Sequence, residues 1–257
     1  MSLVHGLETP LHALVTGASS GIGLALVAQL LAREDTHRVL AVARSAADSP
    51  ALRALAEAHP GRLIRIAVDL SVAADRARLG ALVRAEVDAL HLLFNAAGLL
   101  HAEGLQPEKS LAQLSESALQ RSFALNAFAP ILLVQALLPL FDAKQPGMIA
   151  SLSARVGSIA DNALGGWYSY RAAKAAQNQL MRTLAVELKR SHPKLAVLQL
   201  HPGTVDTPLS APFKARVPAA KLFTPDQSAA LLLQVIAAST AADSGRFLAY
   251  DGSEVPW

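Results

Sequence analysis

The 257-residue sequence predicts a doubly wound α/β fold, in which helices cover both faces of one seven-stranded parallel sheet. Short apolar runs alternate along the chain with segments whose apolar residues recur at helical spacing. The apolar runs are continuous, which is typical of strands buried on both faces. Hydrophobic residues make up 52% of the chain and aromatic residues only 5%. This Ala-, Leu- and Val-rich composition suits helices packed on a buried sheet.

The strands and helices follow from these patterns in chain order. The predicted strands are 13–15, 39–43, 63–68, 92–94, 148–152, 195–200 and 247–250. Among the predicted helices are 22–31, 79–90, 175–188 and 229–237. Strands alternating with helices form parallel βαβ units, so residues 1–257 are predicted to be a single Rossmann-type domain. Residues 202–224 hold four prolines without a clear period, which predicts a substrate loop at about 204–224.

Composition excludes several classes of protein. The net charge is +3, and no basic run is long enough for a nucleic-acid patch. Cysteine is absent, which excludes disulfides, thiolate metal sites and cysteine nucleophiles. The eight histidines show no metal-ligand spacing, so no metal site is expected.

Two segments bear on membranes and targeting. Residues 123–141 carry no charge but contain Pro130 and Pro139, which would break the hydrogen bonding of a lone membrane span. A buried helix is predicted there instead. The first ten residues lack a basic start followed by an apolar run, so no signal peptide is expected. We therefore expect a cytoplasmic protein without a membrane partner.

The first predicted strand runs into a glycine-rich turn, and a predicted helix follows at once. Gly17 lets the chain turn sharply, Gly21 lets backbone N–H groups approach a pyrophosphate, and Gly23 lets the helix pack closely on the strand. The helix N-terminus adds N–H groups and a favourable dipole for phosphate. This order favours nucleotide binding over an empty turn. The predicted contacts in the turn are Gly17, Ser19, Ser20, Gly21, Ile22 and Gly23.

The turn resembles that of the short-chain dehydrogenase/reductase family, and the resemblance extends over nearly the whole chain in order and spacing. The matching segments are Asp69-Leu70, Asn95-Ala96-Ala97-Gly98, Asn126, Tyr170-x-x-x-Lys174 and Pro202-Gly203-x-Val205-x-Thr207. Ala96 stands where the family has a second Asn. Segments 153–159, 165–171 and 250–257 look like the C-factor and sniffer-type carbonyl reductase branch. The resemblance implies an NAD(P)-dependent oxidoreductase whose cofactor contacts, besides the glycine turn, are Asp69, Leu70, Asn95, Ala96, Ala97, Gly98, Tyr170, Lys174, Pro202, Gly203, Val205 and Thr207.

The end of the second predicted strand bears on the form of the cofactor. An acid there accepts a hydrogen bond from the ribose 2′-hydroxyl and favours NAD, whereas a base without an acid binds the 2′-phosphate and favours NADP. Ala43 stands where the resemblance places the acid, and Arg44 follows. A guanidinium can hold phosphate through its planar fork. We therefore expect NADP(H) to be favoured over NAD(H), although Ser20 occupies the second basic position that some NADP enzymes use.

Tyr170 and Lys174 are four residues apart on a predicted helix and therefore share one face. The pKa of a tyrosine is near 10, and a nearby ammonium stabilises the phenolate and lowers that pKa. The pair is therefore predicted to be the acid/base group. The resemblance implies that Lys174 also holds the nicotinamide ribose, and that Asn126 anchors a water that relays protons from Lys174 to solvent.

The serine that donates to the substrate oxygen in the family has no simple counterpart here. Without a gap, its position is occupied by Ala154. Ser153 would serve if the strand bulges, and Ser158 precedes Tyr170 by 12 residues. Both serines stay open as candidates, and each could equally be a small polar turn residue.

These residues predict hydride transfer between NADP(H) and a carbonyl or secondary alcohol. The alternative is a non-catalytic dinucleotide-binding regulatory or signalling module of the same fold, which Ala96 and Ala154 keep open. Leu209, Phe213 and Leu222 indicate a hydrophobic small-molecule substrate. The helices around 111–141 and 168–190 are expected to be apolar on more than one face, which predicts a homo-oligomer, most simply a homodimer.

Overall fold

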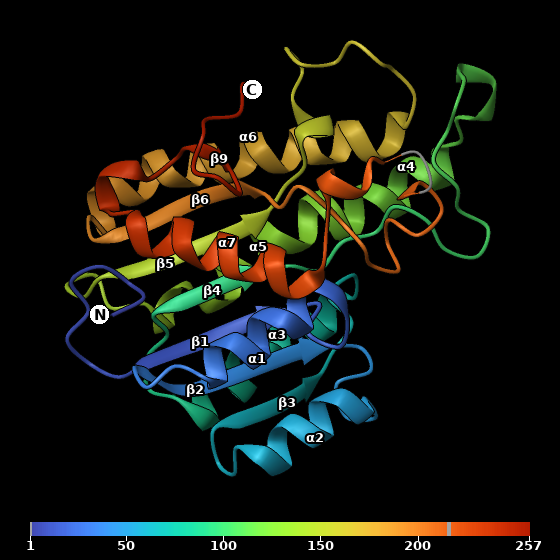
Figure 1. Ribbon diagram of the computed structural model, residues 1–257. Helices are drawn as coiled ribbons and strands as arrows, with labels where there is room; N and C mark the ends of the chain where they lie inside the picture. The colour runs from blue at the N-terminus through green and yellow to red at the C-terminus, as the bar shows by residue number, and fades with distance from the viewer. Residues whose placement is uncertain (1, 215–216) are drawn as a thin grey trace.

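A parallel sheet of seven strands runs through the computed structural model, which describes residues 2–214 and 217–257 (Figure 1). The strands are β1 (Leu11–Thr16), β2 (Thr36–Ala43), β3 (Leu63–Ala67), β4 (Leu92–Asn95), β5 (Gly147–Leu152), β6 (Leu195–His201) and β9 (Phe247–Ala249). Their spatial order is β3-β2-β1-β4-β5-β6-β9, so the chain reverses direction across the sheet between β1 and β4. The predicted doubly wound fold is confirmed.

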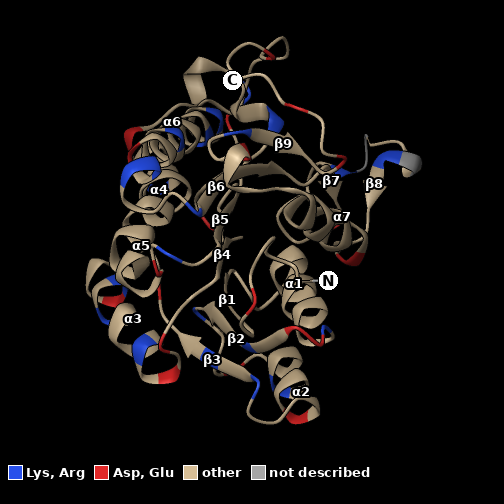
Figure 2. Ribbon diagram, turned by 90° about the vertical axis from the view of Figure 1, so that its left-hand side faces the viewer, with Lys and Arg blue, Asp and Glu red and all other residues tan. Residues whose placement is uncertain are grey.

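Helices cover both faces of the sheet (Figure 2). One layer holds α1 (Gly21–Leu31), α2 (Pro50–Ala58) and α7 (Pro225–Ala238), and the other holds α3 (Ala73–Glu86), α4 (Glu116–Phe123), α5 (Ala129–Leu137) and α6 (Tyr168–Ser191). A hydrophobic core lies on each face, and the strands contribute alternate residues to the two. In β1, for example, Val15 joins the core under α1, whereas Leu14 joins the core under α5 and α6. Strands buried on both faces explain the continuous apolar runs.

The strand predictions agree with the structure to within three residues at each end, whereas the helices need corrections. The helix predicted over 79–90 is α3, which ends at Glu86 because the chain then turns to bring Leu90 into the core. Helix α2 was not predicted, although Ser49 caps it by accepting a hydrogen bond from the Leu52 N–H and Pro50 follows the cap. Helix α6 begins seven residues earlier than the predicted 175–188 and ends at Ser191.

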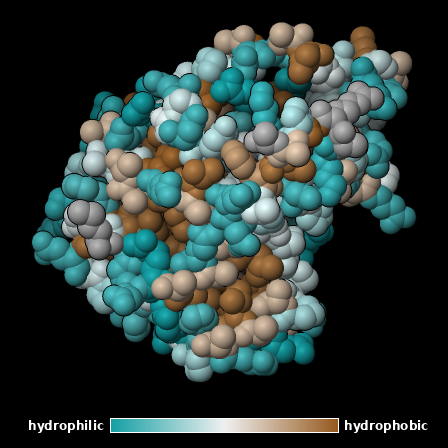
Figure 3. Space-filling view, in the orientation of Figure 1, coloured by the Kyte–Doolittle hydropathy of each residue, from teal (hydrophilic) through white to brown (hydrophobic). Residues whose placement is uncertain are grey.

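The long apolar stretch lies in a continuous helical segment, Glu116–Leu140, which by length and composition alone could cross a membrane. Here it packs against the sheet, with Leu133, Val134 and Leu137 in the core. The segment contains a π-helical turn, Ala124–Phe128, between α4 and α5. The prediction of a buried core helix fits this packing. In the space-filling view hydrophobic side chains lie mainly in recesses between hydrophilic ridges (Figure 3).

Three histidines meet where the amino ends of β1, β2 and β4 lie side by side. His12 Nδ1 bonds to the Ala89 carbonyl at 2.9 Å, and its Nε2 lies 3.2 Å from His37 Nδ1. His91 Nδ1 accepts from the His12 backbone N–H at 3.1 Å. The Ala89 carbonyl can only accept, so His12 carries its proton on Nδ1, and His91 Nδ1 can accept only while the His91 ring is neutral. Burial lowers the pKa of both His12 and His91 below the ordinary value.

This cluster predicts a loss of stability in mild acid. A histidine whose folded-state pKa is lowered binds its proton more readily when unfolded, so stability is full above the unfolded pKa of about 6.5 and falls as pH decreases through it. Urea unfolding at pH about 7.5 and about 5 should show this decrease. His91→Asn keeps an acceptor for the His12 N–H without titrating, and should reduce the pH dependence. An equal pH dependence in both proteins would contradict the assignment.

Candidate active site

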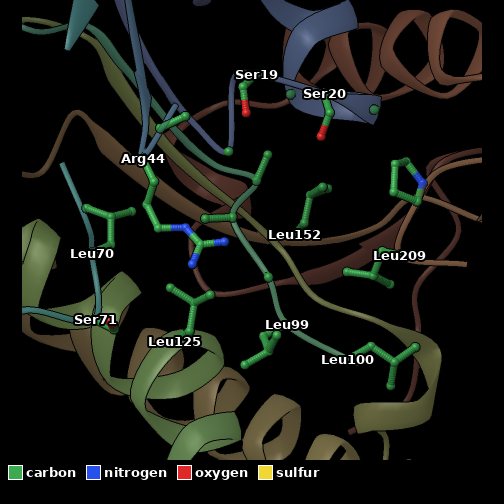
Figure 4. Close-up of a pocket in the computed structure, with 18 of the residues that line it drawn as sticks. Ser19, Ser20, Arg44, Leu70, Ser71, Leu99, Leu100, Leu125, Leu152 and Leu209 are labelled. Carbon is green, nitrogen blue, oxygen red and sulfur yellow. The ribbon is translucent and has the colours of Figure 1, made fainter. Parts of the chain in front are cut away.

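A cavity of about 820 Å³ opens at the carboxyl ends of the central strands, beside the reversal between β1 and β4 (Figure 4). In doubly wound folds ligands bind at this place. The predicted residues that line it are Gly17, Ser19, Ser20, Gly21, Ile22, Gly23, Arg44, Asp69, Leu70, Ala96, Ala97, Gly98, Ser153, Tyr170, Lys174, Pro202 and Thr207. Asn95, Asn126, Ser158, Gly203 and Val205 are not among the lining residues.

The glycine turn has little room for side chains. Gly17 and Gly21 adopt φ of +65° and +53°, which L side chains rarely adopt. A Cβ on Gly17 would lie 2.8 Å from the Ala97 backbone N, and one on Gly23 would lie 2.3 Å from the Gly17 carbonyl oxygen. Glycine at these two positions therefore lets β1, α1 and the loop after β4 pack together. The N-terminus of α1, at Gly21, faces the cavity as the turn predicts.

The loop after β4 is held from two sides. Thr16 Oγ1 accepts hydrogen bonds from the backbone N–H groups of Ala96 and Ala97, at 3.1 and 3.2 Å. Asn126 pairs with the backbone of Leu99, because its Oδ1 accepts from the Leu99 N–H at 2.8 Å and its Nδ2 donates to the Leu99 carbonyl at 2.6 Å. Asn126 is fully buried in the π-helical turn. Its amide therefore fixes the position of the cavity wall.

The segment after β6 contacts the glycine turn. A Cβ on Gly21 would lie 3.1 Å from Thr207 Cγ2, so Thr207 closes over the turn. Gly203 has φ +78°, and a Cβ there would lie 2.6 Å from the Phe223 ring. The predicted loop contains a small parallel pairing, in which β7 (Thr204–Val205) lies against β8 (Leu222–Phe223). Within the predicted loop, residues 215 and 216 lie outside the described residues.

Arg44 extends from the end of β2 into the cavity, where its guanidinium lies among Leu70, Leu99 and Leu125 (Figure 4). Among residues 2–214 and 217–257, no hydrogen bond or ion pair to this guanidinium occurs. Asp69 lies two residues beyond β3 and accepts from Ser71 Oγ at 2.6 Å. Arg44 is thus a cation on the cavity wall without a protein partner in the described chain.

Tyr170 and Lys174 lie on the face of α6 that packs on the sheet, and both line the cavity. The Lys174 ammonium lies 5.8 Å from the centroid of the Tyr170 ring. Burial raises the pKa of Tyr170 above its ordinary value and lowers the pKa of Lys174 to about 7. An oxidised nicotinamide would add a positive charge beside the tyrosine and would favour its phenolate.

The two candidate serines are both engaged elsewhere in the protein. Ser153 Oγ donates to Asn178 Oδ1 at 2.6 Å, on the side of β5 that faces α6. Ser158 Oγ accepts from the Asp161 N–H at 3.1 Å. Ser153 belongs to the cavity wall, whereas Ser158 is buried outside it. The strand ends at Leu152, and Ala154 follows with extended backbone.

Replacing Ser153 with Ala should destabilise the fold. Asn178 Nδ2 already has no hydrogen-bond partner among the described residues, and the variant would leave Oδ1 unpartnered as well. A buried polar group without a partner destabilises by about 1–3 kcal/mol. Urea unfolding measures this effect. Unchanged stability together with lost turnover would contradict the structural assignment and support a catalytic hydroxyl.

The N-terminus of α6 is fixed by Glu108, which sequence reasoning missed. Glu108 is 3% exposed. Its carboxylate accepts hydrogen bonds from Ser169 Oγ and the Ser169 N–H, and its carbonyl accepts from the Trp167 N–H. Trp167 has φ +52° and no capping side chain, so Glu108 satisfies the first turn in its place. Glu108 therefore orients the turn that carries Tyr170. Glu108 and Ser169 are 61 residues apart, so no local sequence pattern indicated their contact.

Other cavity residues had no motif to reveal them. Leu125, Gln120 and Arg121 line the cavity from α4 and the π-helical turn. His101 joins them from the loop after β4 and bonds to the Pro208 carbonyl at 3.0 Å. Their position in the wall depends on how the helix is rotated, which the sequence leaves undetermined.

Comparison with known proteins decides the family. The family profile described as short chain dehydrogenase matches residues 11–217.

The chain belongs to the short-chain dehydrogenase family.

Two curated proteins are similar in sequence to this dehydrogenase. It is 37% identical over 148 residues to the C-signal protein of Myxococcus xanthus, which covers 58% of this chain and 84% of that protein. It is 32% identical over 159 residues to 1-hydroxy-2-glutathionyl-2-methyl-3-butene dehydrogenase of Rhodococcus sp. (strain AD45), with 62% and 67% covered.

Solved structures connect the dehydrogenase to carbonyl reductases. The NADPH-bound carbonyl reductase from chicken fatty liver has a TM-score of 0.84 and 29% identity, over 98% of this chain and 100% of that one. The carbonyl reductase Sniffer of D. melanogaster has a TM-score of 0.85 and 26% identity, over 97% and 100%. The family and these relatives make the chain an NAD(P)-dependent oxidoreductase of the carbonyl reductase branch.

Proposed function

We propose that this dehydrogenase transfers a hydride between NADP(H) and the carbonyl or secondary alcohol carbon of an apolar small molecule. One observation carries the proposal: a single cavity joins the glycine turn and Arg44 at one end to Tyr170 and Lys174 at the other. The glycine turn and Arg44 can bind the phosphate groups of a dinucleotide, and Tyr170 and Lys174 can transfer a proton beside its nicotinamide. We also propose that residues 1–257 form one domain and that the protein is cytoplasmic.

The proposed cofactor site is assembled from the glycine turn, the loop after β4 and Arg44. Gly17, Gly21 and Gly23 leave the backbone open to a pyrophosphate, and Arg44 would pair with the 2′-phosphate of NADP. Two structures in support are those of the NADPH-bound chicken reductase and a short chain dehydrogenase from Burkholderia cenocepacia J2315 in complex with NADP, which has 26% identity and a TM-score of 0.78 over 95% of this chain and 98% of that one.

In the proposed reaction Tyr170 donates a proton to the carbonyl oxygen, or removes one from the alcohol. When bound, the nicotinamide supplies or accepts the hydride. Lys174 stabilises the phenolate through its charge. Asn126 holds the cavity wall at Leu99 and, as the resemblance implies, serves the proton relay. Because Ser153 donates to Asn178, we propose that Tyr170 acts as the main hydrogen-bond donor to the substrate oxygen.

The substrate half of the cavity supports an apolar substrate. Leu99, Leu100 and Leu209 line this half. Among the described residues, Asp69 is the one acidic residue that lines the cavity, and it lies near the cofactor end. Trp167 contacts Phe213 at a ring-centroid distance of 4.8 Å and Tyr170 at 6.4 Å, so aromatic rings close the wall beside the tyrosine.

Cofactor binding and turnover should be measured together. We expect the protein to bind NADPH in a fluorescence titration and to oxidise it in the presence of apolar ketones or aldehydes. Ala96 and Ala154 keep the second candidate function, a dinucleotide-binding module, in view. Binding without turnover across a broad carbonyl panel would support that module, and no binding of either dinucleotide would refute both functions.

We propose a homodimer from one exposed apolar segment, rather than from the two that the sequence indicated. The prediction that residues 168–190 are apolar on more than one face is wrong, because the outer face of α6 carries Gln179, Arg182, Thr183, Glu187 and Arg190 beside Val186. On the neighbouring segment, Phe128 is 49% and Leu132 36% exposed. Burial of these side chains in a partner would favour association.

Light scattering at micromolar concentration tests the oligomer. We expect a mass near twice the 26.9 kDa of the chain. Phe128→Glu should shift the mass toward the monomer, because it places a charge in the proposed interface. A mass of one chain at every concentration, with or without cofactor, would contradict the proposal.

A further inference from the structure

Lys174 is held by a side chain that neither the family motif nor the proposed reaction includes. Lys174 is 3% exposed, and its ammonium donates to the Leu152 carbonyl at 2.8 Å and to Gln177 Oε1 at 2.9 Å. Gln177 lies one helical turn beyond Lys174, so Tyr170, Lys174 and Gln177 follow one another along the same face of α6. This face packs on the sheet.

The orientation of the Gln177 amide is fixed by its other partners. Its Nε2 donates to the Leu152 carbonyl at 3.2 Å and to Gln199 Oε1 at 2.9 Å. A carbonyl oxygen can only accept, so the atom of Gln177 beside it must be the NH₂ group. The oxygen of Gln177 therefore faces Lys174 whether that lysine is charged or neutral.

Gln199 supports Gln177 from the middle of an otherwise apolar strand. It is 2% exposed in β6, among Val197, Leu198 and Leu200. Burying two amides is unfavourable unless they are hydrogen-bonded, and a pair of apolar residues would fill the same space without that requirement. Gln199 Oε1 accepts from Gln177 Nε2, and Gln199 Nε2 donates to the Leu198 carbonyl at 3.3 Å, which leaves the Gln177 oxygen to accept from Lys174.

The partners of the Lys174 ammonium in the described residues are neutral. No ion pair joins it to a carboxylate in the described chain, and burial lowers its pKa to about 7. Tyr170 and Arg171 lie on the same helix, and the elements that pack against α6 there carry the titratable or charged side chains Arg155, His201, Glu116 and Arg121. Arg155 pairs with Asp161, and Arg171 and Arg121 donate to backbone carbonyls. Neutral acceptors thus hold the ammonium.

We propose that Gln177 is a positioning residue, which, braced by Gln199, holds the Lys174 ammonium in place and keeps it protonated beside Tyr170. A neutral amide oxygen stabilises the charged form of its donor without forming an ion pair that would draw Lys174 away from the cavity. The proposal deepens the proposed function, on which its catalytic meaning rests.

The titration of Lys174 tests this proposal without turnover. In [¹³C]lysine-labelled protein free of cofactor, the Cε resonance of Lys174 is the one missing from Lys174→Met. We expect Gln177→Leu to lower the titration midpoint of Lys174 by about one pH unit, because the variant loses a hydrogen bond to a charged group. Gln179→Leu, on the exposed face of α6, is the matched control and should leave the midpoint unchanged.

A double variant separates positioning from stability. Gln177→Leu leaves the Gln199 oxygen without a partner and lowers stability, whereas Gln177→Leu with Gln199→Leu replaces the pair by apolar side chains and should recover the fold. We expect the lowered midpoint to persist in the double variant. A wild-type midpoint in either the single or the double variant would overturn the proposal.

The pH profile of alcohol oxidation provides the functional measurement. With Lys174 less protonated, the phenolate of Tyr170 is less stabilised, so the rise of kcat/KM with pH should move to higher pH in the double variant. A shifted Lys174 midpoint in a protein without turnover would sustain the positioning role and refute the proposed reaction. An unshifted Lys174 midpoint in an active enzyme would refute the positioning role and sustain the proposed reaction.

Discussion

Tyr170→Phe should lower kcat by about 10²-fold or more while the protein folds and binds NADPH as before. The substitution removes one hydroxyl from a ring whose position is set by α6 and by contact with Trp167. The loss should therefore fall on proton transfer. Steady-state kinetics with a carbonyl compound that the wild-type protein reduces measures kcat. A fluorescence titration of NADPH measures cofactor binding separately.

Tyr168 provides a control on the same helix. It lies two residues earlier, is 40% exposed and has Ala at the position four residues on, where Tyr170 has Lys174. Tyr168→Phe should leave kcat within a few-fold of the wild type. Full activity in Tyr170→Phe, or an equal loss in both variants, would contradict the assignment of the proton donor.

Arg44→Asp should reverse the preference from NADP(H) toward NAD(H). It removes the cation proposed to pair with the 2′-phosphate, and a charge-assisted hydrogen bond of this kind contributes about 1.5–3 kcal/mol, or roughly 10- to 100-fold in kcat/KM. The new carboxylate can accept from the ribose 2′-hydroxyl and would repel the phosphate. The ratio of kcat/KM for the two cofactors measures the change.

Arg53→Asp makes the same change of charge on the exposed side of α2, away from the cavity wall. It should leave the cofactor ratio unchanged. If Arg44→Asp also leaves the ratio unchanged, the 2′-phosphate is held by another group, or NAD was preferred from the start.

The fold could be predicted because its strands are buried on both faces. Continuous apolar runs such as 39–43 mark β2 directly, and the turn around Gly17 marks the start of the first βαβ unit. Helix boundaries were less secure, because Val87 to Leu90 continue the apolar pattern of α3 while the chain has already left the helix. After the helix the Leu90 N–H donates to the carbonyl of Leu140, a partner that lies far along the chain and leaves no local signal.

The cavity wall was predicted wherever a motif ties several residues together, as in the glycine turn and the Tyr170–Lys174 pair. Side-chain direction was not predictable where a strand ends, and Ser153 shows why. Ser153 lines the cavity, yet its hydroxyl donates to Asn178. Glu108 and Gln199 were missed because their partners, Ser169 and Gln177, are distant in sequence and meet only in the folded chain.

The central claim is hydride transfer by a cavity that joins a dinucleotide site to an acid/base tyrosine. Isotope tracing tests it most directly. NADPH carrying deuterium at the transferable C4 position is incubated with the protein and a panel of apolar ketones and aldehydes, and the alcohols are analysed by mass spectrometry. We predict deuterium on the carbinol carbon with the wild-type protein and at least 10²-fold less with Tyr170→Phe. Tight binding of NADPH with no deuterium in any alcohol would contradict the account.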